Sequence, residues 1–376
     1  VEFVGQPIFA VAASTVDQAR KAARRGAIEF DPLPAILDPV TAVEQRSFVL
    51  PSETMQRGDP EAALANAPLR LSRRLALGGQ DQFYLEGQVA MAMHEEDGRL
   101  LVYSSTQHPD EVQTLVGKAT QRDAKDVVVN CRRMGGAFGG KESQAALIAC
   151  IAAIAADRTG RSCKFRLDRD DDMIMTGKRH DFVIDYDVGF DDTGRILGID
   201  FEFASRCGMS ADLSGPVNDR TMFHCDNAYF LENVHILSHR CKTNTVSNTA
   251  FRGFGGPQGM YAIEYVIDDI ARHLGRDPLE IRRRNFYGQG ERNVTHYHQT
   301  VDDNIIDEIF DQLVADSDYE QRYAAIRKLN AGNPVLRHGI AITPVKFGIS
   351  FTATLLNQAG ALVHVYKDGT CLLYTS

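Results

Sequence analysis

The stretch Arg133-Met134-Gly135-Gly136-Ala137-Phe138-Gly139-Gly140-Lys141-Glu142 decides how this chain is expected to fold. It follows a candidate strand at 127–129 and precedes an apolar segment, 143–157, that reads as a helix with Gly160 as its natural stop. Glycines at such a place let the backbone come close to a ligand and present N–H groups at a helix start. The stretch therefore predicts a strand, a glycine loop suited to an anionic ligand, and a helix.

A second glycine loop lies at 248–259, with the sequence Asn-Thr-Ala-Phe-Arg-Gly-Phe-Gly-Gly-Pro-Gln-Gly. It leads into a segment whose apolar residues recur at helical spacing. Neither loop has the G-x-G-x-x-G spacing of a dinucleotide site. Together the two loops predict one large anionic ligand held between them, and the plainer alternative is that the glycines serve only tight packing.

The first loop also resembles most of a nucleotide-binding P-loop, through Gly135, Gly140 and Lys141. The next residue is Glu142, where that loop needs a Ser or Thr hydroxyl for magnesium. A carboxylate at this position would repel phosphates, so a P-loop nucleotide-binding module is kept only as an alternative from another class of function.

The remaining pattern mixes helices and strands without a regular βαβα alternation, which favours the α+β class. Residues 1–45 read as the end of a small αβ domain, with a strand at 3–13 and a helix capped by Thr15. We also expect strands near 100–105, 181–205, 340–350 and 361–366. Helices are expected at 263–274, from 278 onward with Asp277 as its cap, and at 302–329.

Composition narrows the function. The 376 residues carry a net charge of −9, which gives no electrostatic reason to expect nucleic-acid binding. No apolar run approaches the roughly 20 residues needed to cross a bilayer. The seven cysteines are widely spaced and form no C-x-x-C, which argues against a disulfide framework or an iron–sulfur cluster built from this chain and favours a reducing cytoplasm. The first residue is Val1, so the chain is expected to begin within a longer protein.

Four motifs together resemble the molybdopterin-binding subunit of the xanthine dehydrogenase/aldehyde oxidase family. They are G-Q-D-Q-F-Y-L-E at 79–86, the loop at 133–142, S-N-T-A-F-R-G-F-G-G-P-Q-G at 247–259, and K-F-G-I-S-F-T at 346–352. The resemblance runs from about residue 4 to residue 370 and is closest to the bacterial form, in which this subunit is a separate chain. It implies an α+β fold with the remnant of an α/β hammerhead domain at 1–45, a first molybdopterin-binding domain at 60–300, and the start of a second at 320–376.

The resemblance also implies roles for individual residues. The cofactor-binding residues would be Gln107, Phe138, Gly139, Arg252 and Gly253, of which Gln107, Phe138 and Arg252 would lie near molybdenum without binding it through their side chains. The substrate-binding residues would be Glu142, Arg220, Phe254, Phe351 and Thr352. Aldehyde oxidases carry other residues in place of the glutamate and the arginine, so this pair points to a purine substrate.

The implied reaction is hydroxylation of hypoxanthine and xanthine to urate with water, at a molybdopterin that carries an oxo-sulfido molybdenum, as in purine catabolism. The implied partners are 2Fe-2S clusters and FAD on a partner chain or a missing region, in a higher oligomer, with neither nucleic acid nor membrane. The base, a glutamate, is expected beyond residue 376. The alternatives are an aldehyde oxidase or other N-heterocycle hydroxylase of the same family, and a remnant that keeps the fold without the chemistry.

Overall fold

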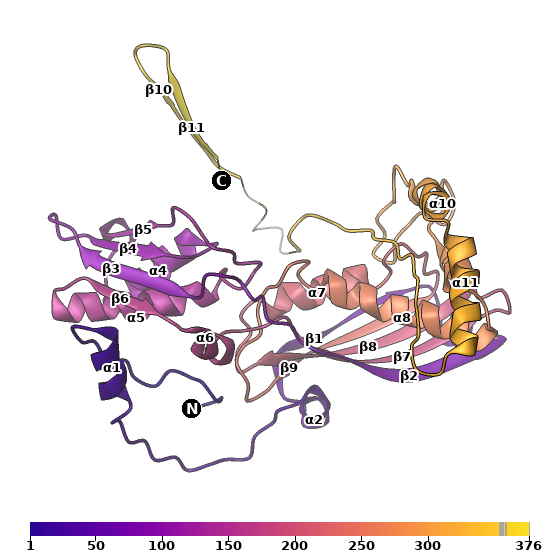
Figure 1. Cartoon of the computed structure of the whole chain (residues 1–376), viewed down its shortest axis with the longest axis horizontal. Coiled ribbons are helices and arrows are strands. Elements are labelled where there is room, and N and C mark those ends of the chain that lie inside the picture. The colour runs from indigo at the N-terminus through magenta and orange to yellow at the C-terminus, as the bar shows by residue number, and fades with distance from the viewer. Residues whose placement is uncertain (353–356, 358, 376) are drawn as a thin grey trace.

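The computed structural model describes residues 1–352, 357 and 359–375. Two sheets, each with its own hydrophobic core, form two lobes that lie end to end (Figure 1). The small lobe holds a four-stranded sheet in the order β5-β4-β3-β6, and the large lobe holds a five-stranded sheet in the order β1-β9-β8-β7-β2. This mixture of separate sheets and helices confirms the α+β class.

In the small lobe, α5 (Gln144–Thr159) packs against the sheet formed by β3 (Val89–His94), β4 (Leu100–Ser104), β5 (Val127–Asn130) and β6 (Cys163–Arg166). Helix α4 (Pro109–Thr120) covers α5 and β5. The buried face of α5 is mainly alanine, which lets the helix approach its neighbours closely. The predicted helix after the first glycine loop and the strands before it are confirmed, and Gly160 ends the helix in a left-handed conformation.

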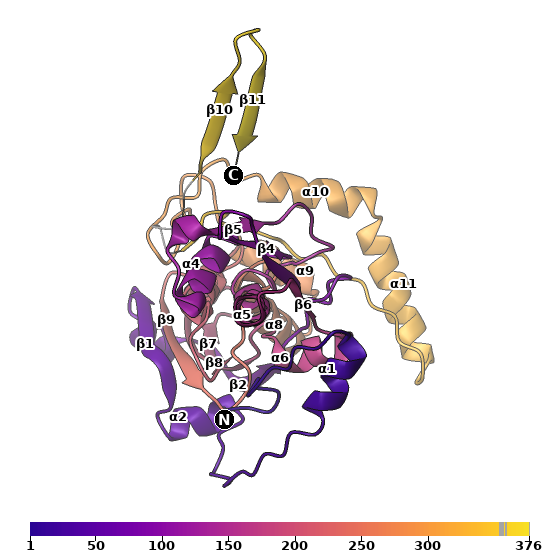
Figure 2. The same cartoon turned by 90° about the vertical axis from the view of Figure 1, so that its left-hand side faces the viewer.

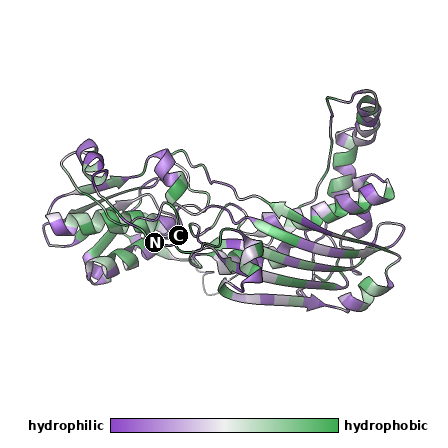
Figure 3. Cartoon of the chain, turned by 90° about the horizontal axis from the view of Figure 1, so that it is seen from below, coloured by the Kyte–Doolittle hydropathy of each residue, from purple (hydrophilic) through white to green (hydrophobic). Residues whose placement is uncertain are grey.

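The large sheet contains β1 (Phe48–Arg57), β2 (Leu69–Leu77), β7 (Phe182–Phe190), β8 (Ile196–Gly208) and β9 (Val234–Lys242). Apolar and polar residues alternate along its strands (Figure 3), as expected for a sheet with one face toward a core. Helices α7 (Ser214–His224) and α8 (Gly256–Leu274) lie over one face and α2 (Pro39–Glu44) lies on the other (Figure 1). The helix predicted after the second glycine loop is therefore confirmed.

Shorter helices connect and flank the lobes. They are α1 (Val16–Ala23), α3 (Pro60–Asn66), the 3-10 turn η1 (Ala124–Asp126), α6 (Arg169–Met175) and α9 (Pro278–Asn285). The caps predicted at Thr15 and Asp277 are confirmed, because each side chain accepts a backbone N–H of its helix. The single helix predicted over 302–329 is two helices, α10 (Ile306–Asp316) and α11 (Tyr319–Gly332), since Asp318 adopts a left-handed φ of 49° and interrupts the hydrogen-bond ladder.

Two predicted strands do not form within the described residues. Residues 3–13 and 340–350 are extended or irregular, and neither pairs with another strand. A strand needs a neighbour to take its backbone hydrogen bonds, and neither segment has one among the described residues. The hairpin of β10 (Ala361–Val365) and β11 (Cys371–Thr375) does form, and it projects away from both lobes (Figures 1 and 2). No helix among the described residues is long and apolar enough to cross a membrane.

Candidate functional site

The two glycine loops contain the same backbone turn. Phe138 and Phe254 both have positive φ angles, 54° and 49°, and each is followed by a glycine with φ near 100°, 101° at Gly139 and 93° at Gly255. A bulky residue rarely adopts positive φ, and such conformations concentrate at functional sites where the surrounding structure enforces them. Each Phe-Gly-Gly turn lies just ahead of a helix, α5 or α8. The two turns are therefore a repeated structural device.

The two loops contact each other directly. The backbone N–H of Arg252 donates to the carbonyl oxygen of Phe138 at 2.9 Å. A Cβ atom on Gly139 would lie 2.7 Å from the carbonyl group of Ala250, which is too close for any side chain to be accommodated. The expected convergence of the loops is confirmed. The alternative that the glycines serve tight packing also holds for Gly139, because the absence of a side chain there lets the second loop lie against it.

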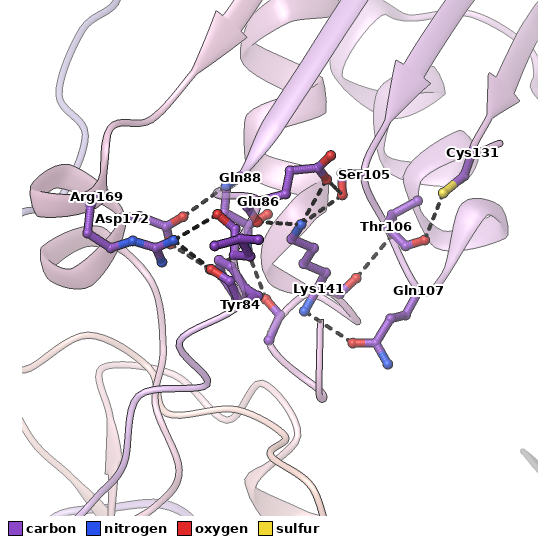
Figure 4. Close-up of polar contacts among 12 residues, drawn as sticks. Tyr84, Glu86, Gln88, Ser105, Thr106, Gln107, Cys131, Lys141, Arg169 and Asp172 are labelled. Carbon is purple, nitrogen blue, oxygen red and sulfur yellow. Dashed lines mark hydrogen bonds and ion pairs between the residues drawn. The ribbon is translucent and has the colours of Figure 1, made fainter. Parts of the chain in front are cut away.

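The segment 82–88 contacts both loops, and Figure 4 shows its residues Tyr84, Glu86 and Gln88 beside Lys141 of the first loop. The Gln82 amide donates to the carbonyl of Ala250 at 2.8 Å, and the Gln88 amide donates to that of Gly140 at 2.9 Å. This segment overlaps the 79–86 motif and has no regular secondary structure. Its polar side chains thus satisfy loop carbonyls that would otherwise be buried without partners.

Gln107 points its amide at the first loop. Its Oε1 accepts the backbone N–H of Gly139 at 2.9 Å and that of Lys141 at 3.3 Å (Figure 4). With the oxygen committed to these two donors, the exposed NH₂ group faces outward as a hydrogen-bond donor. A donor beside two closely approaching backbone turns fits an oxygen-rich, negatively charged group such as an oxo ligand of a pterin-bound metal.

Lys141 excludes the P-loop alternative. Its side chain is completely buried and its ammonium donates to the carbonyl and the carboxylate of Glu86 and to the hydroxyl of Ser105. A P-loop lysine must reach the phosphates of a nucleotide. Since this ammonium is turned into the protein and its donors are occupied, the structure contradicts the P-loop alternative.

Glu142 lies at the start of α5 next to a second carboxylate that the sequence did not single out. Burial, with a smaller contribution from the negative charge of Asp212, raises the pKa of Glu142 to about 7. Asp212 accepts hydrogen bonds from Ser143 at 2.7 Å and Gln144 at 2.8 Å, both in the turn after Glu142, and from Thr249 at 2.6 Å in the second loop. Asp212 also precedes α7, so it joins three parts of the site. Its only local signal is a position two residues before that helix.

Arg220 of α7 holds the motif at 346–352 against the second loop. Its guanidinium donates to the carbonyl oxygens of Gly348, at 2.5 Å, and Ser350, and lies 5.9 Å from the ring of Phe254. The Thr352 hydroxyl donates to the carbonyl of Pro216 at 3.2 Å, also in α7. The structure thus brings Arg220, Phe254 and the predicted substrate residues of the 346–352 motif into one cluster.

The rings of Phe254 and Phe351 lie 5.0 Å apart between centroids, tilted by 48°. A flat ring sandwiched between two aromatic rings needs about 7 Å, twice the contact distance between carbon atoms. The two rings are therefore adjacent, as the motifs predict, but they contact each other in this conformation. A substrate between them would require the rings to separate by about 2 Å.

Two contacting glycine turns, polar side chains that satisfy their carbonyls and an outward amide donor fit a large, oxygen-rich cofactor. The chain belongs to the molybdopterin cofactor-binding family: the family profile described as molybdopterin cofactor-binding domain matches residues 42–286, and a second profile with the same description matches residues 312–376.

Relatives and solved structures agree with this membership. The chain is 40% identical to the xanthine dehydrogenase of Emericella nidulans and 41% identical to the xanthine dehydrogenase/oxidase of Mus musculus, over 99% of its own length. It spans 27% and 28% of the lengths of these two relatives. The aldehyde oxidoreductase of Desulfovibrio gigas has the same fold, with a TM-score of 0.77 and 22% identity over 96% of this chain and 40% of that one.

Proposed function

We propose that this chain forms the cofactor- and substrate-binding part of a molybdenum hydroxylase that converts hypoxanthine and xanthine to urate with water. The names of the relatives at about 40% identity support a purine reaction. The residues Glu142 and Arg220 support it independently, because a carboxyl group and a guanidinium can read opposite edges of a flat, nitrogen-rich ring.

The observation that carries this proposal is the bridge made by Asp212. Its carboxylate joins the turn that follows Glu142, the second glycine loop and the start of α7, which bears Arg220. The predicted purine-binding pair therefore flanks the same loops that would hold the cofactor. Near neutral pH the raised pKa of Glu142 lets its carboxyl group either donate to or accept from a ring nitrogen. Arg220 keeps its positive charge and would stabilise negative charge that develops on the ring.

Five residues are proposed to hold the cofactor: Gln107, Phe138, Gly139, Arg252 and Gly253. Gln107 would donate its free NH₂ to an oxo group, and the two turns would shape the wall beside the metal. When bound, molybdopterin would supply the molybdenum centre at which the substrate is oxidised. The chain's own residues would bind and orient the ring there, and Phe254 and Phe351 would exclude water from its faces.

The wider organisation is part of the same proposal. Domain boundaries at 1–45, 60–300 and 320–376 are proposed alongside the matched ranges 42–286 and 312–376. Iron–sulfur clusters and FAD on a partner chain or another region would carry electrons away. A cytoplasmic location is supported by the seven cysteines, all of which are free thiols.

The test compares two substrates in the complete enzyme that contains this chain. We expect Glu142→Gln and Arg220→Met each to lower kcat/KM for xanthine by about 100-fold or more, since each removes a charged or protonated group from the ring edge. Molybdenum content should stay at the wild-type level. An aromatic aldehyde, which lacks the ring nitrogens, should lose less than about tenfold. Equal losses on both substrates, or wild-type purine turnover in both variants, would remove the purine assignment and favour the aldehyde alternative.

A further inference from the structure

Lys141 is a fully buried lysine in the middle of the candidate cofactor site. Its ammonium donates its three N–H groups to the Glu86 carbonyl at 2.8 Å, the Glu86 carboxylate at 3.1 Å and the Ser105 hydroxyl at 2.8 Å. It also lies 4.8 Å from the ring of Tyr84 (Figure 4). Every hydrogen-bonding capacity of this ammonium is therefore satisfied inside the protein.

The same residue holds three consecutive residues at the end of β4. Its side chain binds Ser105, its carbonyl accepts the Thr106 hydroxyl at 3.2 Å and the Gln107 N–H at 2.9 Å, and its own N–H donates to the Gln107 amide oxygen at 3.3 Å. The backbone and the side-chain amide of Gln107 are thus both set by Lys141. The direction in which Gln107 presents its NH₂ group follows from these contacts.

Glu86 extends this control to the start of the glycine loop. Its backbone N–H donates to the carbonyl of Gly135 at 3.1 Å, while its carbonyl and carboxylate both accept from Lys141. A Cβ atom on Gly135 would lie only 2.5 Å from that of Glu86, so the two segments are in close contact. Gly135 at the start of the loop and Lys141 near its end are consequently both bound to Glu86.

We propose that Lys141 is a positioning residue: its buried ammonium, held by Glu86 and Ser105, orients the Gln107 amide and the Phe138-Gly139 turn toward the bound cofactor. Only the lysine of this ion pair is buried, since the Glu86 side chain is 42% exposed. Such a pair is a poor source of stability, because desolvation of the ammonium offsets its attraction to a carboxylate that water also solvates. An apolar side chain of the same length would fill this space at lower cost. The charge pair is therefore explained by the geometry that it imposes rather than by stability.

The experiment separates geometry from stability in the complete enzyme. Lys141→Met removes the donor to the Glu86 carbonyl, the Glu86 carboxylate and the Ser105 hydroxyl, so it is expected to lower the unfolding temperature. The double variant Lys141→Met with Glu86→Gln removes both charges and is expected to unfold close to the single variant, because the 42% exposed Glu86 carboxylate is solvated without its partner. The control is Arg282→Met in the large lobe, where a guanidinium with 3% exposure pairs with Asp268 at 42% exposure and with Glu264 at 16%, against 0% and 42% for Lys141 and Glu86.

The decisive readout is amide hydrogen exchange at Gly139 and Lys141, the two N–H groups that Gln107 accepts. We expect both lysine variants, and not Arg282→Met, to exchange these amides at least about tenfold faster, and we expect kcat for xanthine to fall more than KM changes. Wild-type exchange and wild-type kcat in the double variant would overturn the proposal. The kinetic arm rests on the proposed function, whereas the exchange arm does not, so an enzyme that fails to oxidise purines still tests the role of Lys141.

Discussion

The backbone N–H of Arg252 reaches the carbonyl oxygen of Phe138 across the interface of two loops that are far apart in the sequence. This bond fixes the position of one Phe-Gly-Gly turn relative to the other, so the two loops form a single surface. Any change that separates them should affect cofactor binding before it affects either sheet, because each sheet has its own core.

Gly139 should be the most sensitive glycine of this surface. An alanine there would combine a φ of 101° with a Cβ atom 2.7 Å from the Ala250 carbonyl. We expect Gly139→Ala to lower the free energy of unfolding by more than about 2 kcal/mol and to reduce bound molybdenum. Denaturant titration and metal analysis measure the two effects.

The matched control is Gly160→Ala, which has a φ of 65° but no heavy atom within 4 Å of the added Cβ. It should cost only about 1 kcal/mol and leave the molybdenum content unchanged. If the two variants behaved alike, backbone conformation alone would explain the effect and the loop contact would be unimportant.

The half-buried carboxyl of Glu142 should give the protein a distinctive pH dependence. Its pKa is raised from 4.5 to about 7, so the folded state holds this proton more tightly than the unfolded state does. Stability should therefore fall as the pH rises from about 4.5 to 7, by on the order of 3 kcal/mol from this group, and this contribution should level off above pH 7. Unfolding free energies of the wild type and Glu142→Gln between pH 5 and 8 test the sign, and parallel profiles would contradict it.

Phe351 is partly exposed, so its removal should affect binding more than folding. Loss of one aromatic face costs about 1 kcal/mol, which predicts a roughly five- to tenfold higher KM for xanthine in Phe351→Ala with little change in unfolding temperature. Steady-state kinetics and a thermal melt are sufficient. Phe201→Leu is a useful contrast, since this fully buried ring of the large core should affect the melt and not KM.

A buried ion pair fixes the segment that carries the predicted stacking residue. The completely buried Asp226 carboxylate accepts from the Lys346 ammonium at 2.9 Å and from the Tyr287 hydroxyl at 2.6 Å. Lys346→Met would leave a buried charge without its counter-ion and should cost about 3–5 kcal/mol. Tyr287→Phe removes one hydrogen bond and should cost about 1 kcal/mol. Equilibrium unfolding ranks the two, and the reverse order would show that the ion pair is dispensable.

Much of the site could be predicted from local sequence. The helix after Lys141-Glu142, the cap at Asp277 and the approach of the two glycine loops were all expected and are all observed. The role of Lys141 was not, because the same Gly-Lys pattern suits a lysine that binds phosphate and a lysine buried inside the protein equally well. Its partner Glu86 lies in a different segment, and no periodicity connects the two.

The sequence by itself determined the elements whose signals are local, namely helices and turns, since their hydrogen bonds and caps join residues only a few positions apart. Tertiary structure alone decided that residues 3–13 and 340–350 remain unpaired, that Asp212 binds the turn after Glu142, and that the rings of Phe254 and Phe351 lie against each other. These outcomes depend on which distant segments the two cores bring together. Such contacts stabilise the protein only once the chain has folded, so no local sequence pattern reports them.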